Sequence, residues 1–378
     1  MIRDIINEIK GNNYPIPSLD DAKVDVWASW FKGDVKNIHN YTGFDGRDTF
    51  RLKLKTMGMA KRICEDWADL LLNERTDIVL SNDDATKQLN KILRETNFWV
   101  KANEGIEKTF ALGLGAFVIG VDNIQVGVNS GEIKKDNGKL RIDFVDRFKI
   151  TPITIENKVI TESAFTVEGS KETHYIVHVR DEKGIYIIHN FTYDNEKKEI
   201  TNEYKFDTKS SKPLFYMIRP FIVSNDLMRN YDTDLGVSIF ANAIDTLQAI
   251  DTKYDSFDNE FIAGRKRLFT NEEIWNVHNK KDGTIAKEFN PLQSIFYKLP
   301  ARDDGSKVED SSGPLRATEH ILALNTELSI LSDKCGMGVG YYKFDGSGAV
   351  TATQVVSENS NLFRSVKKHE ILLEAALY

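Results

Sequence analysis

The stretch that decides the fold is DLGVSIFANAIDTLQAIDTKYDSFDNEFIAGRKRLF, residues 234–269. Large apolar side chains recur every three or four residues from Phe240 to Phe261, which is the spacing of one face of a helix about six turns long. Gly264 and three cations follow, as is typical of a helix C-terminus, where positive charge complements the helix dipole. The stretch therefore predicts one long helix with an apolar stripe.

A second helix of the same kind is predicted after a broken stretch of sequence. Residues 268–312 are interrupted by Gly, Pro, Asp and Ser, and PLRATEHILALNTELSILSDKC (residues 314–335) then places apolar residues in one seam that ends at Cys335. Pro314 occupies the position expected for the first residue of a helix. Two long helices with a small insert between them form a hairpin, a plan that is unusual for a globular enzyme.

The chain before this hairpin has two kinds of sequence. Residues 1–112 have helical periodicity, and we expect helices within residues 20–31, 47–74 and 84–113. Residues 114–225 are rich in β-branched and aromatic side chains separated by turn residues, which predicts a sheet. The fold class that follows is α+β.

The glycine-rich stretch GMGVGYYKFDGSGAVTATQVVSENS, residues 336–360, follows the second long helix. It lacks the lysine of a phosphate-binding loop, and its glycines follow a helix, whereas the dinucleotide-binding fingerprint follows a strand. We interpret the glycines as a source of backbone freedom in a mobile loop whose base is held by Tyr341, Tyr342 and Phe344. TATQ at residues 351–354 matches a capping box, so a further helix should begin there. A plain surface connector is the alternative.

The charge balance disfavours an ordinary sequence-reading DNA-binding protein. The net charge is -7, whereas such proteins are usually basic. An acidic surface repels a phosphate backbone, which suits a partner that must slide. The two cysteines are far apart, the first residues lack a signal-peptide core, and no apolar run reaches about 18 residues. We therefore expect a soluble cytoplasmic protein without disulfides or membrane spans.

The sequence contains no recognisable catalytic or metal-binding motif, and we expect no cofactor. His174 and His178 would lie about 13 Å apart on a strand, which is too far for them to share a metal ion. Cys64 and Cys335 occupy apolar positions of predicted helices. That placement favours packing over nucleophilic roles for both thiols.

The order of these parts resembles the portal proteins of tailed bacteriophages, particularly the portal family of long-tailed phages of Gram-positive bacteria. KTMGMAKRICEDWADLLLNERTDI (residues 55–78) is similar to that family's N-terminal helix. Residues 234–269 resemble its first stem helix and the entry to its clip. FDGSGAVTATQVVSENSNLFRSVKKHE (residues 344–370) resembles its tunnel loop and tunnel helix. The resemblance covers nearly the whole chain.

The resemblance implies a portal fold of several parts. These are a wing at residues 1–235 (helical over 1–112, sheet-containing over 113–235), stem helices at 236–264 and 314–335, a small α/β clip at 265–313, a tunnel loop at 336–350 and a tunnel helix at 351–378. A C-terminal crown of further helices normally follows. Because the chain stops within an apolar helical pattern, we expect the crown to be missing.

The resemblance also implies a function. Portal subunits form a ring of about twelve copies at one vertex of the capsid. Double-stranded DNA enters through the central channel without sequence specificity, driven by a terminase, and later leaves through it into the tail. The implied partners are the terminase large subunit, a head-completion adaptor, and capsid and scaffolding proteins, with no membrane. The implied location is the virion, after assembly in the host cytoplasm.

The residues that approach DNA are implied in the same way. The tunnel-loop candidates are Lys343, Phe344, Asp345, Gly346, Ser347 and Gly348, and the basic candidates at the junction of stem and clip are Arg265, Lys266 and Arg267. The three basic residues fit helix C-caps or ring salt bridges as well as DNA contacts. No catalytic residue is implied, so the chain is not expected to be an enzyme.

Two other functions stay open at this point. One is a metal-dependent nucleic-acid-processing enzyme, for which the sequence offers scattered carboxylates but no convergent set. The other is a helical scaffold protein that forms no channel. DNA cleavage with added magnesium would support the enzyme, and ring formation separates a portal from a scaffold.

Overall fold

The computed structural model describes residues 1–17, 21–44, 48–72, 76–126, 133–223, 235–264, 267–271, 295–299, 308–310, 314–344 and 352–377, which have an α+β fold. The helices are α1 (Ile2–Lys10), α2 (Asp21–Lys32), α3 (Lys36–His39), α4 (Met59–Leu71), α5 (Asp83–Glu95), α6 (Phe98–Leu112), α8 (Ile244–Ala263), α9 (Ala317–Lys334) and α10 (Ala352–Leu377). The strands are β1 (Asn40–Phe44), β2 (Thr49–Lys53), β3 (Gly115–Val126), β4 (Ile133–Asp146), β5 (Ile150–Glu156), β6 (Val159–Glu168), β7 (Glu172–Arg180), β8 (Tyr186–Asp194), β9 (Glu199–Asp207), β10 (Phe215–Ile218), β11 (Arg267–Asn271), β12 (Ile295–Leu299) and β13 (Val308–Asp310).

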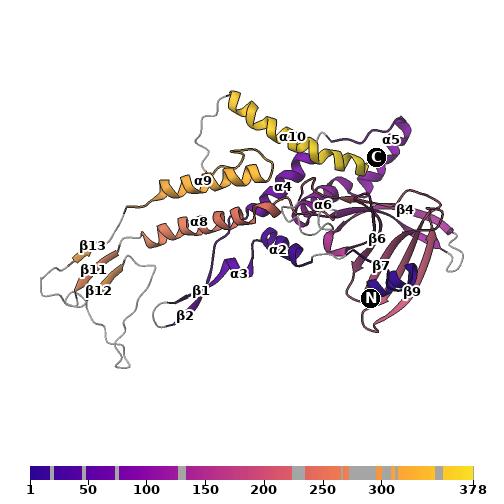
Figure 1. Ribbon diagram of the computed structural model, residues 1–378, viewed down its shortest axis with the longest axis horizontal. Helices are drawn as coiled ribbons and strands as arrows, with labels where there is room; N and C mark the ends of the chain where they lie inside the picture. Colours follow the sequence, from indigo (N-terminus) through magenta and orange to yellow (C-terminus); the bar gives the residue numbers. More distant parts are fainter. Residues whose placement is uncertain are drawn as a thin grey trace.

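The molecule is elongated (Figure 1). Strands β3 to β10 and helices α1, α4, α5 and α6 form a body, and α8 and α9 extend from it side by side as an arm. The small sheet of β11, β12 and β13 lies at the far end of the arm. Helix α10 begins above α9 and runs back to the body, so the chain returns there after the arm.

Two antiparallel sheets build the body. Strands β5 to β9 pair in chain order as a five-stranded meander, and β10, β3 and β4 form a second sheet with β3 at its centre. Helix α1 covers one face of the larger sheet, where Ile5 and Ile6 pack with Ile153 and Val177. These strands confirm the sheet predicted for residues 114–225.

The largest apolar cluster joins the body to the base of the arm. It contains side chains of α4 and α6 together with Leu247 and Ile250 of α8 and Leu324 and Leu328 of α9. Ion pairs connect the two arm helices along their length: Lys334–Asp245 at 3.0 Å, Lys253–Glu327 at 2.9 Å and Arg316–Glu260 at 2.7 Å. The two long helices and their apolar stripes are therefore present, and the stripes pack against each other and the body.

The helix predicted over residues 47–74 is wrong in its first part. Thr49–Lys53 forms β2, which pairs with β1 as an antiparallel hairpin. The sequence TFRLK alternates polar and apolar residues, which is a strand pattern, but it is too short to stand out from the helical period that follows. Helix α4 begins only at Met59, after Gly58 in a left-handed conformation with φ 69°.

The helix predicted over residues 84–113 is in fact two helices, α5 and α6. Asn97, between them, adopts a left-handed conformation with φ 53°, which no continuous α-helix contains. Apolar residues keep a helical spacing on both sides of the break. Periodicity alone therefore did not reveal the boundary.

The arm helices begin later than their sequence patterns suggest. Helix α8 starts at Ile244, and Phe240 lies in the turn before it. Helix α9 starts at Ala317, so Pro314 precedes the helix and is not its first residue. Arg316, the residue before α9, is bound to α8. Both its backbone N–H and its guanidinium donate to the Glu260 carboxylate.

The insert at the far end of the arm contributes a three-stranded sheet. Strand β11 is central, and it pairs with β12 in parallel and with β13 in antiparallel orientation. The other residues predicted to form a small α/β clip within 265–313 lie outside the described residues.

Candidate functional site

The segment that joins α9 to α10 contains most of the residues that the sequence analysis singled out. It leaves α9 in tight turns in which Gly336, Gly338 and Gly340 have φ values of 77°, 90° and 83°. An added Cβ at Gly336 would also come within 3.2 Å of the Ser365 hydroxyl on α10. A defined backbone shape, and not backbone freedom, requires glycine at the first of these positions.

The first part of the predicted mobile loop is packed. Met337 and Tyr342 are buried in the main apolar cluster. The Met337 N–H donates to the Ser332 carbonyl at 2.8 Å. These contacts argue against free motion of Met337 and Tyr342, because the core holds both side chains, and the mobility predicted for the loop as a whole stays a prediction. Residues 345–350 lie outside the described residues.

Tyr342 connects this segment to helix α4. Its hydroxyl donates to the Asp66 carboxylate at 2.8 Å, and its N–H donates to the Ser332 hydroxyl at 3.1 Å. Burial and the bond to Asp66 raise the pKa of Tyr342 far above its usual range, so the phenol keeps its proton. The second oxygen of Asp66 accepts from Arg62 at 2.8 Å, on the solvent side.

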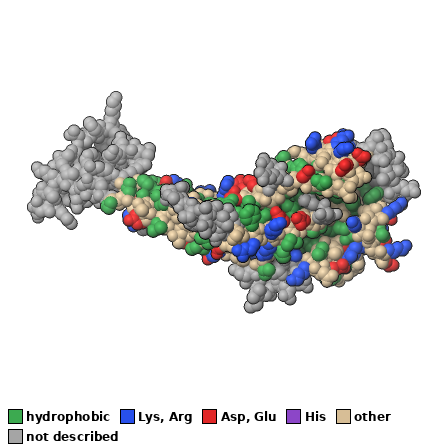
Figure 2. Space-filling view, turned by 90° about the horizontal axis from the view of Figure 1, so that it is seen from above, with side chains coloured by type: hydrophobic (Ala, Val, Ile, Leu, Met, Phe, Trp, Pro, Cys, Tyr) green, Lys and Arg blue, Asp and Glu red, His purple; other side chains and the backbone are tan. Residues whose placement is uncertain are grey.

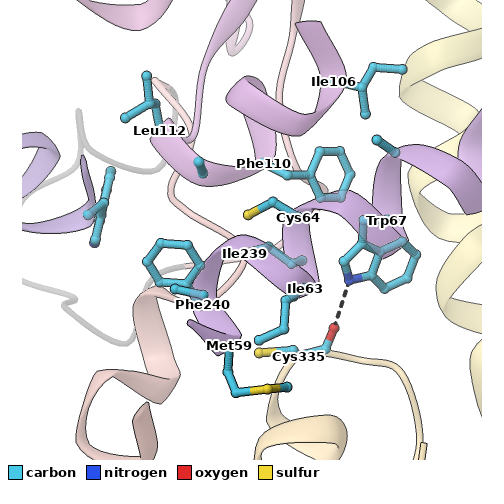
Figure 3. Close-up of a cluster of buried hydrophobic side chains, with 14 of the residues drawn as sticks. Met59, Ile63, Cys64, Trp67, Ile106, Phe110, Leu112, Ile239, Phe240 and Cys335 are labelled. Carbon is cyan, nitrogen blue, oxygen red and sulfur yellow. Dashed lines mark hydrogen bonds between the residues drawn. The ribbon is translucent and has the colours of Figure 1, made fainter. Parts of the chain in front are cut away.

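Trp67, the next residue of α4, contacts the chain at both ends of the same region, and Figure 3 shows its bond to Cys335. Its indole N–H donates to the Cys335 carbonyl at 3.2 Å, where α9 ends. Its ring meets the His369 ring of α10 edge-on, with centroids 4.6 Å apart. Adjacent α4 residues thus contact the end of α9, the following turns and α10.

His369 fixes the second half of α10 on the body. Its Nδ1 accepts the Phe221 N–H at 3.0 Å, and its ring packs on Phe110 as well as on α4. Burial, with a smaller effect of the neighbouring Lys368, lowers the pKa of His369 to about 3. The imidazole is therefore neutral at physiological pH and acts as a packed hydrogen-bond acceptor.

The described tunnel-loop candidates have different roles. Phe344 packs edge-on against Phe257 of α8, with ring centroids 5.6 Å apart, and its N–H donates to Asn325 at 2.7 Å. Lys343 is exposed. Tyr341 is 42% exposed, and no described residue accepts from its hydroxyl. Tyr342 and Phe344 therefore contact buried groups at the base of the segment, whereas the Tyr341 ring packs edge-on against Tyr342, with centroids 4.9 Å apart.

The remaining candidates are not tested by the structure. Asp345, Gly346, Ser347 and Gly348 lie outside the described residues, as do Arg265 and Lys266. The backbone of Arg267 begins β11, opposite Ile295 of β12. The structure therefore leaves these candidates as predictions.

A basic group on α10 was missed by the sequence analysis. Arg364, Lys367 and Lys368 are exposed on this helix. Arg364 donates to the Asn361 side chain at 3.0 Å and lines an open pocket of about 320 Å³ between α10 and the turns after α9. The sequence RSVKK at residues 364–368 could have predicted this basic group, since three cations in five residues are unusual in an acidic chain.

Among the described residues, cysteine and histidine side chains form no alternative centre. Cys64 and Cys335 are buried in the main cluster, which confirms their predicted packing role, and burial raises the pKa of both thiols, that of Cys335 to about 12. His174 and His178 lie on strand β7, as predicted. In the described part of the chain, no three His, Cys, Asp or Glu side chains converge as metal ligands would.

None of the helices searched there has the length and apolar character needed to span a bilayer.

The arrangement defines an elongated α+β protein with a two-helix arm and a returning helix, in which the glycine-containing residues 336–344 after the arm pack against the body. The family model described as phage portal protein, SPP1 Gp6-like, matches residues 20–378. Because that match covers nearly the whole chain, the chain belongs to this family, and the resemblance to phage portal proteins is confirmed. No curated protein matches the chain. Family membership supports a phage portal role and a place in the virion capsid.

Proposed function

We propose that the chain is the portal subunit that forms a ring-shaped channel at the capsid vertex, through which DNA is packaged and ejected. The observation that supports this most is the family match over residues 20–378, which includes the whole arm and the returning helix. In this proposal the body is the wing, α8 and α9 are the stem, residues 265–313 are the clip, and α10 is the tunnel helix.

Exposed apolar side chains on the arm support assembly with further copies. Leu322 and Ile330 of α9 are 69% and 42% exposed, and Leu315, just before this helix, is 48% exposed. Figure 2 shows hydrophobic side chains exposed along the arm. A surface helix normally presents polar residues to water, and a neighbouring subunit in a ring would cover such a face.

Charge supports passage of DNA without tight binding. Each chain carries a net charge of -7, so the net negative charge of a ring increases with the number of subunits and repels the phosphate backbone. Lys343 and the α10 cations are candidates for weak, salt-screened contacts with the phosphates. In this proposal Lys343 to Gly348 face the channel, and no base-specific contact is needed.

In this proposal the two ends of the molecule have different partners. The clip docks the terminase large subunit during packaging and the head-completion adaptor afterwards, and the wing contacts capsid and scaffolding proteins. The protein acts in the virion after assembly in the host cytoplasm. Replacing Gly346 and Gly348 with rigid residues should impair packaging and leave rings intact.

The test of this function is the mass and shape of the assembled particle. We expect electron microscopy and mass measurement of the purified chain to show a closed ring of about twelve subunits with a central hole. Particles that remain at the subunit mass of 43.0 kDa over a wide concentration range, alone and with capsid and scaffolding proteins, would contradict the proposal. DNA cleavage with added magnesium would instead support an enzyme.

A further inference from the structure

Two consecutive residues of α4 hold the connection between the arm and α10 on both sides. The Trp67 indole binds the backbone where α9 ends, and Asp66 binds the hydroxyl of Tyr342 seven residues later. The Trp67 ring also packs on His369, which lies beyond the connection on α10. One turn of a body helix is therefore in contact with the chain before and after residues 345–351.

All three side chains that make these contacts are buried, so water cannot easily replace a lost partner. Asp66 is 6% exposed, Tyr342 is 9% exposed and Trp67 is fully buried. A phenol that lost its carboxylate partner in this environment would also lose its hydrogen bond, because water does not reach it freely. Asp66 would keep its bond to Arg62, whose side chain is 60% exposed. Removing the Tyr342 hydroxyl thus leaves the Asp66–Arg62 pair in place and releases one side of the connection.

We infer that Asp66 and Trp67 are positioning residues for the DNA-facing segment, an inference that rests on the proposed portal function. Trp67 sets where the connection leaves α9 and where α10 returns to the body. Asp66, through Tyr342, sets where the connection departs toward the channel at Lys343. In this inference a body helix, and not the arm alone, places residues 336–344, which lead into the segment proposed to meet DNA.

The experiment compares Tyr342→Phe with Tyr341→Phe in the full chain. Both variants remove one phenolic hydroxyl, but only Tyr342 has a buried partner. In assembled rings, amide hydrogen exchange over residues 336–344 should rise about tenfold or more in Tyr342→Phe and stay unchanged in Tyr341→Phe. The DNA packaged per particle should fall in Tyr342→Phe, with ring yield and melting temperature close to those of the wild type.

A second pair of variants guards against a general loss of folding. Asp66→Asn keeps an oxygen that accepts from Tyr342, whereas Asp66→Leu does not. Asparagine should therefore retain slow exchange and packaging, and leucine should lose both.

The possible failures are distinguishable. Normal packaging by rings of Tyr342→Phe would overturn the positioning role and leave the portal function standing. Unchanged amide hydrogen exchange over residues 336–344 in Tyr342→Phe would also overturn the positioning role. Failure of the wild-type chain to form rings would overturn the portal function, and the positioning role with it.

Discussion

At the scale of single residues, the body depends on a few polar groups that are buried with partners. The Glu162 side chain is 3% exposed and accepts from Lys10 and the Arg180 N–H, each at 2.6 Å, and from Thr154. Burial alone would raise the pKa of Glu162, but these donors outweigh it and lower the pKa. The carboxylate thereby connects α1 to the larger sheet.

Replacing Glu162 with glutamine should reduce the free energy of unfolding by about 3 kcal/mol at pH 7, because it leaves Lys10 beside a neutral group in a buried site. Since the folded pKa lies below the ordinary value of 4.5, the wild-type contribution is complete above that pH and is lost as pH falls through the folded pKa. Urea unfolding at pH 7 and pH 3 measures both effects.

Glu156→Gln is the matched control for this change. Its side chain is 50% exposed and pairs with Arg180 at the surface. We expect a loss of less than about 1 kcal/mol, as for other exposed ion pairs. Equal effects of the two substitutions would contradict a special role of Glu162.

His369 should make stability depend on pH in the mildly acidic range. Because burial lowers its folded pKa to about 3 from 6.5, the unfolded chain binds the extra proton first as pH falls. Its contribution is complete above about pH 6.5 and decreases by about 2 kcal/mol on going to pH 5. Denaturant midpoints at pH 7.5 and 5 should therefore be closer together in His369→Gln than in the wild type.

The exposed His174 provides the control for that measurement. His174→Gln should keep the wild-type pH dependence, since the buried histidines stay unchanged in it. A His369→Gln variant with the wild-type dependence would show that the acid sensitivity originates elsewhere.

At the scale of elements, carboxylates of α8 attach the β1–β2 hairpin to the arm, and Asp251, which is 4% exposed, is the buried one among them. Asp251 of α8 accepts from His39 Nε2 and Thr56, both at 3.0 Å, and from the Met57 N–H at 2.8 Å. His39 Nδ1 accepts the Val35 N–H, so the proton of the neutral ring is on Nε2 and is donated to Asp251.

Asp251→Ala should destabilise the chain by about 3 kcal/mol, because it leaves buried donors without an acceptor. Hydrogen exchange should increase most in β1 and β2, which α8 would no longer hold. Asp255→Ala removes an exposed acceptor of the Lys55 N–H and should have a much smaller effect. Equal exchange in the two variants would argue against Asp251 as the main attachment.

Sequence patterns predicted elements that repeat a local period and missed contacts between distant residues. The arm helices and the sheet were predicted because apolar spacing extends over many residues. The break at Asn97 depends on one backbone conformation and has no periodic signal. In the candidate site, Tyr342 and Phe344 stood out as aromatic residues in a glycine-rich stretch. Asp66 did not, since it lies 276 residues from its partner and no local pattern connects them.

At the scale of the whole molecule, the exposed face of α9 tests the proposed ring. Leu322→Glu should leave the fold of one chain unchanged, because the side chain is 69% exposed there. In a ring it would bury an unpaired carboxylate, and assembly should weaken about tenfold or more. Sedimentation over a concentration series measures this shift.

Val79→Glu is the comparison for assembly. Val79 is 71% exposed and lies between α4 and α5 in the chain, outside the arm helices α8 and α9. The Val79→Glu variant should assemble like the wild type. Rings of Leu322→Glu as stable as those of Val79→Glu would mean that this face of α9 is not covered by a neighbouring subunit.

The ion pairs between α8 and α9 have a mechanical consequence. They lie near both ends and in the middle of the helices, at Asp245, Lys253 and Glu260 of α8. Sliding one helix past the other by a single turn, about 5.4 Å, would break all three pairs and the apolar contacts between them at once. The arm therefore resists shear and behaves as a stiff rod. A force applied to the small sheet at its tip is transmitted to the body as a displacement of the whole rod.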